Sequence, residues 1–260
     1  MGIFRVGVRG SERTGVKEVA LWTPPSAFPR ARVAQLVQSA LGDVSVVRVM
    51  AQPGKERKIK GIEKLAGSGS WSEELVSLRY KVSAPSFFQV NTTQAEKLID
   101  LVLTGLGGKD KLDGAYVADL YAGGGTFTLP LARAGAQVVA VESAASSVRD
   151  LRYNAKTAEV DIEIIGGDAA RELPELGELD ALVVDPPRAG LAKGVPESIE
   201  KAGPGSVAYV SCDVATLARD IARLSALGYE PISVTPVDMF PQTYHVETVV
   251  LMSRVAHGLS

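Results

Sequence analysis

The sequence predicts an α/β protein whose larger domain is a mostly parallel sheet with helices on both faces. From residue 115 onward, apolar runs alternate with helical stretches, which is typical of such a sheet. The last two runs are joined only by "FPQTY" (240–244). That connection is too short for a parallel crossover, so the final strand should be antiparallel. Before residue 86, half-buried strands surround one helix, which predicts a small α+β domain.

The smaller domain is expected to span residues 1–85. Apolar periodicity predicts one helix and three strands in it, at residues 30–41, 17–22, 44–50 and 75–84. Two stretches rich in turn residues, 51–64 and 66–74, are predicted to be a basic turn segment and a loop.

The larger domain is expected to span residues 86–260. It should begin with a helix at 92–106, with Thr92 or Thr93 as the N-cap. The apolar runs then predict seven strands, at residues 115–121, 136–142, 162–168, 180–187, 206–212, 231–239 and 245–252.

Charge is divided unevenly along the chain. Residues 1–87 carry 14 Lys and Arg against 7 Asp and Glu, whereas residues 88–260 carry 14 against 23. A basic first part suits a polyanion such as RNA, although an uneven spread of surface lysines explains the same numbers equally well.

The cysteine content limits the class of protein. One cysteine in 260 residues excludes an internal disulfide and a cysteine-built zinc or iron–sulfur site in this chain. No apolar run has the length of a membrane span, and the first residues show no signal-peptide pattern. We therefore expect a cytoplasmic protein with no membrane contact, no metal and no iron–sulfur cluster. Nothing in the sequence indicates an oligomeric state.

Five successive predicted strands end in glycine, acidic or nucleophilic residues. In chain order these ends are "DLYAGGGTFTLP" (119–130), Glu142, Asp168, "DPPRAG" (185–190) and Cys212. Ligands of open α/β sheets bind beyond the carboxyl ends of the strands. Packing alone does not require such residues at every strand end, so we expect a ligand and a reaction at this edge.

The glycine loop favours a nucleoside ligand that has no pyrophosphate. Gly123 and Gly125 match the start of a dinucleotide fingerprint, but Thr128 stands where its third glycine would be. Glu142 follows Gly123 by 19 residues, at the end of the next strand, where a carboxylate can bind both ribose hydroxyls. S-Adenosylmethionine is a ligand of this kind.

Asp185 and Arg188 flank two prolines that fix the backbone after the fourth strand. The related motif of amino-group methyltransferases ends in an aromatic residue. An arginine in that place argues against methylation of an exocyclic amine and suits a phosphate or another group of the site. A plain turn would account for the prolines but not for Asp185.

Cys212 precedes a predicted helix whose N-cap is Asp213 or Thr216, and a helix N-terminus favours the thiolate. The alternative is a small buried side chain. Beside a methyl donor, a thiolate can add to carbon 6 of uracil or cytosine and make carbon 5 nucleophilic. A base must then remove the carbon-5 proton. Glu247 begins the last strand and should lie near Cys212, unless it is an exposed carboxylate, and His245 is the second candidate for the base.

Five motifs follow one another within residues 80–260: "SFFQVN", "DLYAGGGTFTLPLA", "DPPRAGL", "YVSCDVATLARD" and "DMFPQTYHVE". In this order they resemble those of the RNA uracil-5-methyltransferases, which make 5-methyluridine in tRNA and 23S rRNA. The resemblance implies a Rossmann-like class I methyltransferase sheet, with Cys212 as nucleophile and Glu247 as base. It implies an S-adenosylmethionine site formed by Gln89, Tyr121, Gly123, Gly125, Thr126, Glu142 and Asp185, with Asp168 near the adenine and Arg188 near the catalytic pocket.

The chain departs from the family pattern in several places. Ala122 stands where the family usually has cysteine, and Asp213-Val214 stands where it has Asn-Pro. The second change is expected to alter the loop that presents Cys212. The four cluster-binding cysteines of many rRNA-directed members are absent, and so is the small β-barrel domain with which many members begin. A short member and a fragment of a longer one both fit this pattern.

RNA binding would then fall to the basic first domain. The expected phosphate contacts are Arg48, Lys55, Arg57, Lys58, Lys60 and Lys64, with Lys58 and Lys60 as substrate-binding residues. Phe87, Phe88 and Tyr244 can stack on a nucleotide that has left its helix, although the two phenylalanines also suit a core.

The leading interpretation is therefore an RNA uridine-5-methyltransferase, with 23S rRNA slightly favoured over tRNA. The lean to rRNA rests on the "SFFQVN" and "DMFPQT" segments. A cytosine-5 RNA methyltransferase and an RNA-binding paralogue with weakened catalysis are the alternatives.

Overall fold

The structure is a computed structural model that describes residues 2–54 and 58–255. The chain divides into two compact units, Met1–Phe87 and Phe88–Ser260. The division falls two residues after the boundary expected at residue 85. We call them unit 1 and unit 2 and describe each by itself.

Unit 1 contains a four-stranded sheet in the order β1-β2-β3-β4. A crossover helix, α1 (Arg30–Leu41), joins β2 (Lys17–Thr23) to β3 (Ser45–Ala51), and these two strands pair in parallel. The edge strands, β1 (Arg5–Gly10) and β4 (Ile59–Ala66), are antiparallel to their neighbours. Apolar residues are buried on both faces of the sheet, and β5 (Trp71–Leu75) and β6 (Leu78–Val82) form a separate hairpin.

The strand predictions for unit 1 were wrong at its edges. β1 was not expected, and β4 covers part of the segment predicted as a basic turn. In the run at 75–84, Leu75 ends β5, and Val76 and Ser77, both with positive φ, form the turn to β6, while the rest of β5 falls in the predicted loop. In β4 the apolar residues are three positions apart, which does not indicate a strand, whereas β1 has alternating Val6 and Val8, a signal that the sequence interpretation overlooked.

Unit 2 contains a seven-stranded sheet in the order β12-β13-β11-β10-β7-β8-β9. β13 is antiparallel to both of its neighbours, as the short preceding connection predicted, while β7 to β11 are parallel. The strands are β7 (Tyr116–Leu120), β8 (Gln137–Glu142), β9 (Ile162–Gly166), β10 (Ala181–Val184), β11 (Ser206–Ser211), β12 (Tyr229–Val237) and β13 (Glu247–Arg254). This is the Rossmann-like sheet that the sequence predicted.

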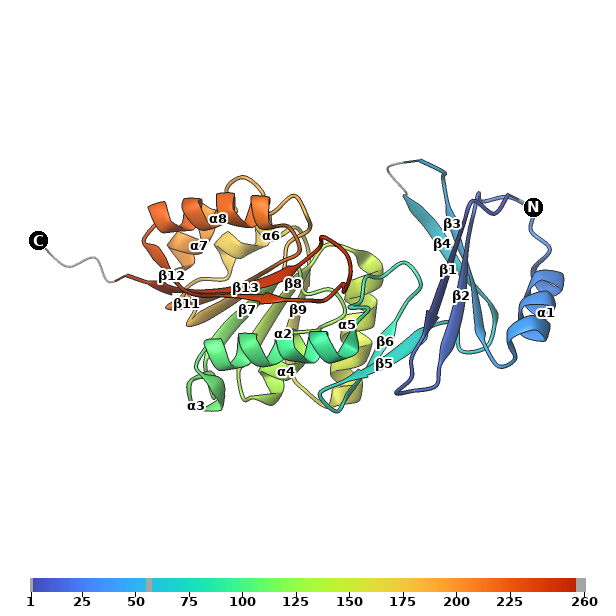
Figure 1. Cartoon of the computed structure of the whole chain (residues 1–260), viewed down its shortest axis with the longest axis horizontal. Helices are drawn as coiled ribbons and strands as arrows, with labels where there is room; N and C mark the ends of the chain where they lie inside the picture. Colours follow the sequence, from blue (N-terminus) through green and yellow to red (C-terminus); the bar gives the residue numbers. More distant parts are fainter. Residues whose placement is uncertain (1, 55–57, 256–260) are drawn as a thin grey trace, which may run out of the picture. The chain divides into compact units, whose positions relative to one another are not determined.

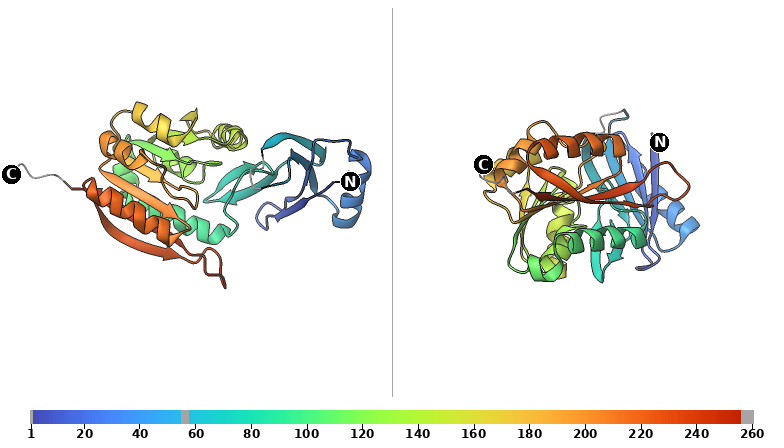
Figure 2. Two further views of the ribbon diagram at one scale, coloured as in Figure 1. Left: turned by 90° about the horizontal axis from the view of Figure 1, so that it is seen from above. Right: turned by 60° about the vertical axis from the view of Figure 1, so that its left-hand side comes forward.

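Helices cover both faces of this sheet. Figures 1 and 2 show α6 (Ala169–Glu172), α7 (Val195–Ala202) and α8 (Val214–Ala226) over one face. Over the other face lie α2 (Thr92–Gly105), with α3 (Gly108–Leu112) after it, and α4 (Thr128–Arg133), which packs against α5 (Ala145–Ala158). The buried side chains between β7, β10, β11 and the first set of helices form the largest described core cluster.

The start of α2 corrects one prediction. Its N-cap is Asn91, one residue before the expected Thr92, and the Asn91 side chain accepts a hydrogen bond from the Gln94 N–H. The Asn91 amide also donates to the Met239 carbonyl. Asparagine is among the best N-cap residues, so its choice over the threonines follows known preferences.

Candidate active site

Cys212 and Glu247 meet at the edge of the unit 2 sheet where the parallel strands end. β11 and β13 are paired so that Ser211 lies opposite Thr248. Cys212 follows Ser211, and Glu247 precedes Thr248, so the antiparallel register brings both to the same edge. The Glu247 carboxylate lies near enough to raise the pKa of the Cys212 thiol. Glu247 is only 4% exposed, which excludes the alternative of a solvent-exposed strand carboxylate.

Arg188 provides a positive charge near both of these groups. Its side chain hydrogen-bonds the Cys212 thiol and lowers the pKa of both Cys212 and Glu247. Its Nη2 also donates to His245 Nε2 at 3.4 Å. The His245 ring lies 4.2 Å, centroid to centroid, from the ring of Tyr244, which is 90% exposed. The structure therefore links the thiol, through Arg188 and His245, to an exposed aromatic side chain.

The ionisation of Cys212 differs from the expectation. The pKa of its thiol is raised, first by burial and then by the Glu247 carboxylate, and the hydrogen bond from Arg188 opposes this. Asp213 is the N-cap of α8, and its carboxylate accepts the N–H groups of Ala215 and Thr216. Because these N–H groups are bonded to Asp213, the helix start does not favour the thiolate as expected. The hydrogen bond and the charge of Arg188 favour the thiolate instead.

The same N-cap concerns Asp213-Val214, which stands where the family has Asn-Pro. Asparagine and aspartate are equally good N-cap residues, and proline is favoured but not required at the first helical position. Asp213 caps the helix through its side chain, and the exposed Val214 begins α8 in regular geometry. Asp213 therefore caps α8 as asparagine would, and the expected alteration of the loop that presents Cys212 stays a prediction.

Glu247 and Asp185, whose charges act on the thiol, and Asp119, whose charge acts on Asp185, have raised pKa values. Burial raises the pKa of Glu247 to about 7, against the lowering effect of Arg188. The pKa of Asp185 is well above its usual range because of burial and the charges of Glu247 and Asp119. Burial also raises the pKa of Asp119 to about 7. Carboxyl groups that exchange protons near neutral pH are suited to general acid–base chemistry.

The glycine loop lies beyond β7 and is tied to the end of β8. The Glu142 carboxylate accepts the Gly123 N–H at 2.8 Å and the Ala144 N–H at 2.6 Å, one on each oxygen. Gly125 has φ +97°, and a Cβ there would lie 2.6 Å from Leu151 Cδ1 of α5. Glycine is required at that position because the loop backbone packs directly on the helix.

Other residues expected at the nucleoside site surround this loop. Tyr121 has positive φ (65°), and the nearby Asp168 carboxylate raises the pKa of its phenol, after burial. Asp168 is exposed and is the N-cap of α6. Thr126 lies in the turn before α4 and is partly buried.

Two buried side-chain oxygens of unit 2, on Gln89 and Asp119, accept no hydrogen bond from the described residues. Gln89 is 3% exposed, and its Oε1 has no hydrogen-bond partner among the described residues. The same holds for Oδ1 of Asp119, whose Oδ2 accepts from the Thr128 hydroxyl. Unsatisfied buried acceptors are rare and costly unless a ligand supplies donors. S-Adenosylmethionine carries an ammonium group and hydroxyl donors, so its chemistry fits these residues.

Asp119 is a buried carboxyl group with a raised pKa that the sequence interpretation did not single out. It is fully buried in β7, under the glycine loop. The signal was present in "YVADLY", since a carboxylate inside an otherwise apolar strand needs a partner or a function.

The expected RNA contacts lie in unit 1, and one of them was wrong. Arg48 is 1% exposed, lies over the Phe28 ring and donates to Thr23, to the carbonyls of Pro24 and Ser26, and to Glu63. All three nitrogen atoms of the Arg48 side chain donate to these groups of unit 1, so Arg48 is not a phosphate ligand.

The remaining basic candidates differ in what can be said of them. Lys58, Lys60 and Lys64 are exposed, at or in β4. Lys55 and Arg57 lie outside the described residues. Of the two phenylalanines, Phe87 is exposed and Phe88 is buried, so Phe88 belongs to the core.

Two other features, a membrane-spanning helix and a metal-binding group, are absent from the described residues. Within residues 2–54 and 58–255, no helix has the length and apolar character of a membrane span. In the same residues, no three His, Cys, Asp or Glu side chains gather as ligands for a metal ion.

The strand order, the reversed last strand and the glycine loop after β7 together define a class I methyltransferase fold. A family model described as tRNA (uracil-5-)-methyltransferase matches residues 72–176 and 175–255. The chain belongs to this family, as its motifs predicted.

Relatives and solved structures agree with this assignment. An uncharacterized RNA methyltransferase of Clostridium acetobutylicum is 36% identical over 260 residues, which is 95% of this chain and 55% of that protein. One from Gloeobacter violaceus is 38% identical over 253 residues, 96% of this chain and 54% of that protein. The chain thus spans about half the length of the curated relatives it matches.

A crystal structure shares the fold more fully than the sequence identity alone suggests. It is the Pyrococcus abyssi tRNA (uracil-54, C5)-methyltransferase in complex with S-adenosyl-L-homocysteine. It is 27% identical, with a TM-score of 0.76, and the match covers 95% of this chain and 59% of that one.

Proposed function

We propose that this protein is an RNA methyltransferase that uses S-adenosylmethionine to methylate carbon 5 of a uridine. The observation that carries the proposal is the meeting of Cys212, Arg188 and the buried Glu247 at the strand ends. A nucleophile, a cation that stabilises its anion and a base with a pKa of about 7 are what this reaction needs.

Residues of the glycine-loop side would hold the methyl donor. Glu142 and Asp168 are acceptors for hydroxyl and amino groups, Gln89 and Asp185 offer oxygens to the amino acid part, and Tyr121, Gly123, Gly125 and Thr126 shape the loop. When bound, S-adenosylmethionine supplies an electrophilic methyl group on its sulfonium.

The residues of this chain act before and after the methyl group is transferred. The Cys212 thiolate adds to carbon 6 of the uracil, and the electron pair of the 5,6 double bond makes carbon 5 nucleophilic. Once carbon 5 is methylated, the Glu247 carboxylate removes its proton. The electron pair of that C–H bond restores the double bond and expels Cys212 as a thiolate, which Arg188 stabilises.

RNA would bind through two kinds of contact. Lys58, Lys60 and Lys64 supply exposed charge for phosphates, and the exposed Tyr244 can stack on a base that has left its helix. We propose 23S rRNA and tRNA as the candidate substrates. The motif segments favour rRNA, whereas the description of the family and the Pyrococcus abyssi enzyme favour tRNA.

The test is an assay of the product with both classes of RNA. The protein, S-adenosylmethionine and unmodified 23S rRNA or tRNA transcripts are incubated, and the digested nucleosides are examined by mass spectrometry. We expect 5-methyluridine from one RNA class and none with Cys212→Ala. Formation of 5-methylcytidine instead would show the cytosine reaction, and RNA binding without methyl transfer would support a binding paralogue.

A further inference from the structure

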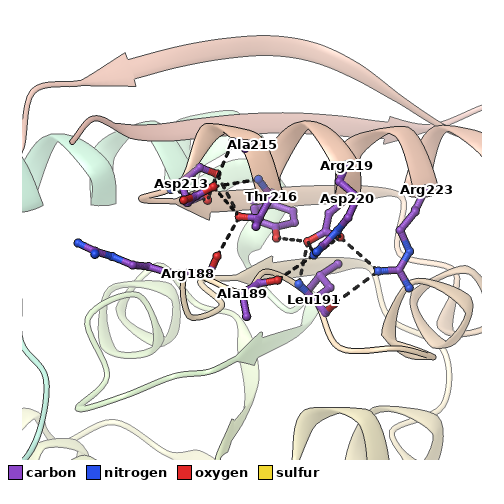
Figure 3. A network of polar contacts seen from close by, with 11 residues as sticks. Arg188, Ala189, Leu191, Asp213, Ala215, Thr216, Arg219, Asp220 and Arg223 are labelled. Carbon is purple, nitrogen blue, oxygen red and sulfur yellow. Dashed lines mark hydrogen bonds and ion pairs between the residues drawn. The ribbon is translucent and has the colours of Figure 1, made fainter. Parts of the chain in front are cut away.

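The loop that carries Arg188 is fastened to α8 through its backbone. Four of its backbone groups, in residues 188–191, bond side chains of that helix (Figure 3). Thr216 Oγ1 donates to the Arg188 carbonyl at 3.1 Å, and Arg219 Nη2 donates to the Ala189 carbonyl at 2.8 Å. The Leu191 N–H donates to Asp220 Oδ2 at 2.7 Å, and Arg223 Nη1 donates to the Leu191 carbonyl at 3.4 Å. We call these four helix side chains the α8 clamp.

Asp220 is the centre of the α8 clamp. It is 0% exposed, yet its carboxylate accepts bonds from Arg219, Arg223 and the Tyr209 hydroxyl as well as from Leu191. Two guanidinium groups compensate the charge, as a buried carboxylate requires. Tyr209 lies in β11, three residues before Cys212. Asp220 therefore joins the strand that leads to the nucleophile with the loop that leads away from Asp185.

Gly190 shows how closely loop and helix approach. It has φ +75°, and a Cβ at this position would overlap Asp220 Oδ2 and Arg219 Nη2. Only glycine allows both the backbone conformation and the approach. The loop is held against the helix at this point, whereas the Arg188 side chain points away from the Asp220 end of the clamp (Figure 3).

α8 therefore adjoins both partners of the hydrogen bond between Arg188 and Cys212. α8 begins two residues after Cys212, and its side chains hold the backbone that carries Arg188. We propose that Arg219 and Asp220 are positioning residues, which hold Arg188 within hydrogen-bond reach of the Cys212 thiol. Neither touches the reacting groups, and the catalytic meaning of the clamp rests on the proposed function.

The clamp has a measurable consequence before any RNA is added. Arg188 opposes the raised pKa of Cys212 through its hydrogen bond and its charge. If Arg188 moves, less thiolate forms near neutral pH, and alkylation by iodoacetamide slows, because the thiolate is the reactive form. Cys212 is the only cysteine in the sequence, so the label reports on this one group.

Arg219→Ala is the first variant to measure. The Arg219 side chain is 49% exposed, so its removal opens no cavity in the core. Arg152→Ala is the matched control, since Arg152 is an exposed helical arginine on α5. We expect Arg219→Ala to slow alkylation about threefold or more, with a higher pH midpoint, because half a pKa unit changes the thiolate fraction about threefold. Arg152→Ala should match the wild type, and Arg219→Lys should recover part of the rate.

A double variant separates positioning from general loosening. If Arg219 acts through Arg188, then Arg219→Ala should have no further effect once Arg188→Ala is present. Asp220→Asn, which keeps the shape but removes the charge, should slow alkylation as Arg219→Ala does. An unchanged or faster alkylation in Arg219→Ala, or additive slowing in the double variant, would overturn the proposal. These results do not depend on methyl transfer, so they stand apart from a failure of the proposed function.

Discussion

At the ends of β7 and β8, the Glu142 carboxylate is satisfied by two backbone N–H groups of the loops around it. At the ends of β10 and β11 and the start of β13, Asp185, Cys212 and Glu247 lie together with raised pKa values and one arginine beside them. Backbone N–H groups fix the position of the Glu142 carboxylate. Burial and the repulsion between like charges raise the pKa values in the second group. A binding group profits from a fixed position, whereas proton transfer needs a group that gains and loses its proton near neutral pH.

The largest effect should come from the catalytic side. Cys212→Ala removes the proposed nucleophile, and we expect methyl transfer to fall by at least about 10⁴-fold, since the residual rate has no covalent route. Binding of S-adenosylmethionine, measured by calorimetry, should stay within about twofold of the wild type, because one uncharged side chain was exchanged for another. A large loss of binding would mean that the two sides of the site are not separable.

The glycine loop should respond through stability rather than chemistry. Gly125→Ala places a methyl group against Leu151 at a positive φ of 97°, and we expect the free energy of unfolding to fall by about 2 kcal/mol. Thermal or urea unfolding measures this loss. Gly123→Ala is the matched comparison, because a Cβ there meets nothing within 4 Å although φ is also positive. An equal loss in both variants would show that the contact with Leu151 contributes nothing.

Asp119 should make stability depend on pH. Burial raises its pKa from 3.8 to about 7, so the folded state keeps a proton that the unfolded chain loses between these values. The free energy of unfolding should therefore fall as pH rises from about 4 to 7. Asp119→Asn cannot titrate, so we expect it to lose about 3 kcal/mol less than the wild type across that window. Asp161→Asn, an exposed aspartate, is the control; parallel pH curves for wild type and Asp119→Asn would contradict the assignment.

The smallest of these effects should come from Glu142. Glu142→Gln keeps one oxygen that can accept a backbone N–H, but it turns the NH₂ group of the amide toward the other N–H. This should weaken both the contacts that hold the loop and the binding of a ribose. We expect the affinity for S-adenosylmethionine to fall about tenfold, as for the loss of one charged hydrogen bond. Glu163→Gln, on the exposed surface of β9, should leave affinity unchanged. Equal affinities for the two variants would remove Glu142 from the ligand site.

Sequence reasoning predicted those parts of the fold that local patterns determine. The apolar runs located all seven strands of unit 2, and the length of "FPQTY" was enough to reverse the last one. That reversal is also why Glu247 could be expected beside Cys212 across 35 residues of chain. Edge strand β4 was missed because its apolar residues are three positions apart, whereas Val6 and Val8 in β1 do alternate with polar residues and the sequence contained that signal.

The other features of the structure depend on distances between residues far apart in the chain, which the sequence pattern does not contain. Arg48 was expected to be a phosphate ligand because it belongs to the basic first part of the chain, but it is buried by Phe28, Thr23 and Glu63. The direction of the Cys212 pKa depends on whether Arg188 or Glu247 has the larger effect, and on burial above all. The α8 clamp joins four side chains of one helix to a loop about 30 residues earlier, and the spacing of these residues does not reveal that contact.

The most direct test of the account is whether Glu247→Gln leaves the protein covalently attached to RNA. A glutamine cannot remove the carbon-5 proton, so Cys212 cannot be expelled and the adduct should accumulate. The measurement is a denaturing gel of Glu247→Gln with S-adenosylmethionine and the substrate RNA, followed by mass spectrometry of the attached peptide. The account predicts a stable adduct at Cys212 that is absent in the Cys212→Ala/Glu247→Gln double variant. Normal turnover by Glu247→Gln, with free 5-methyluridine product and no adduct, would contradict it.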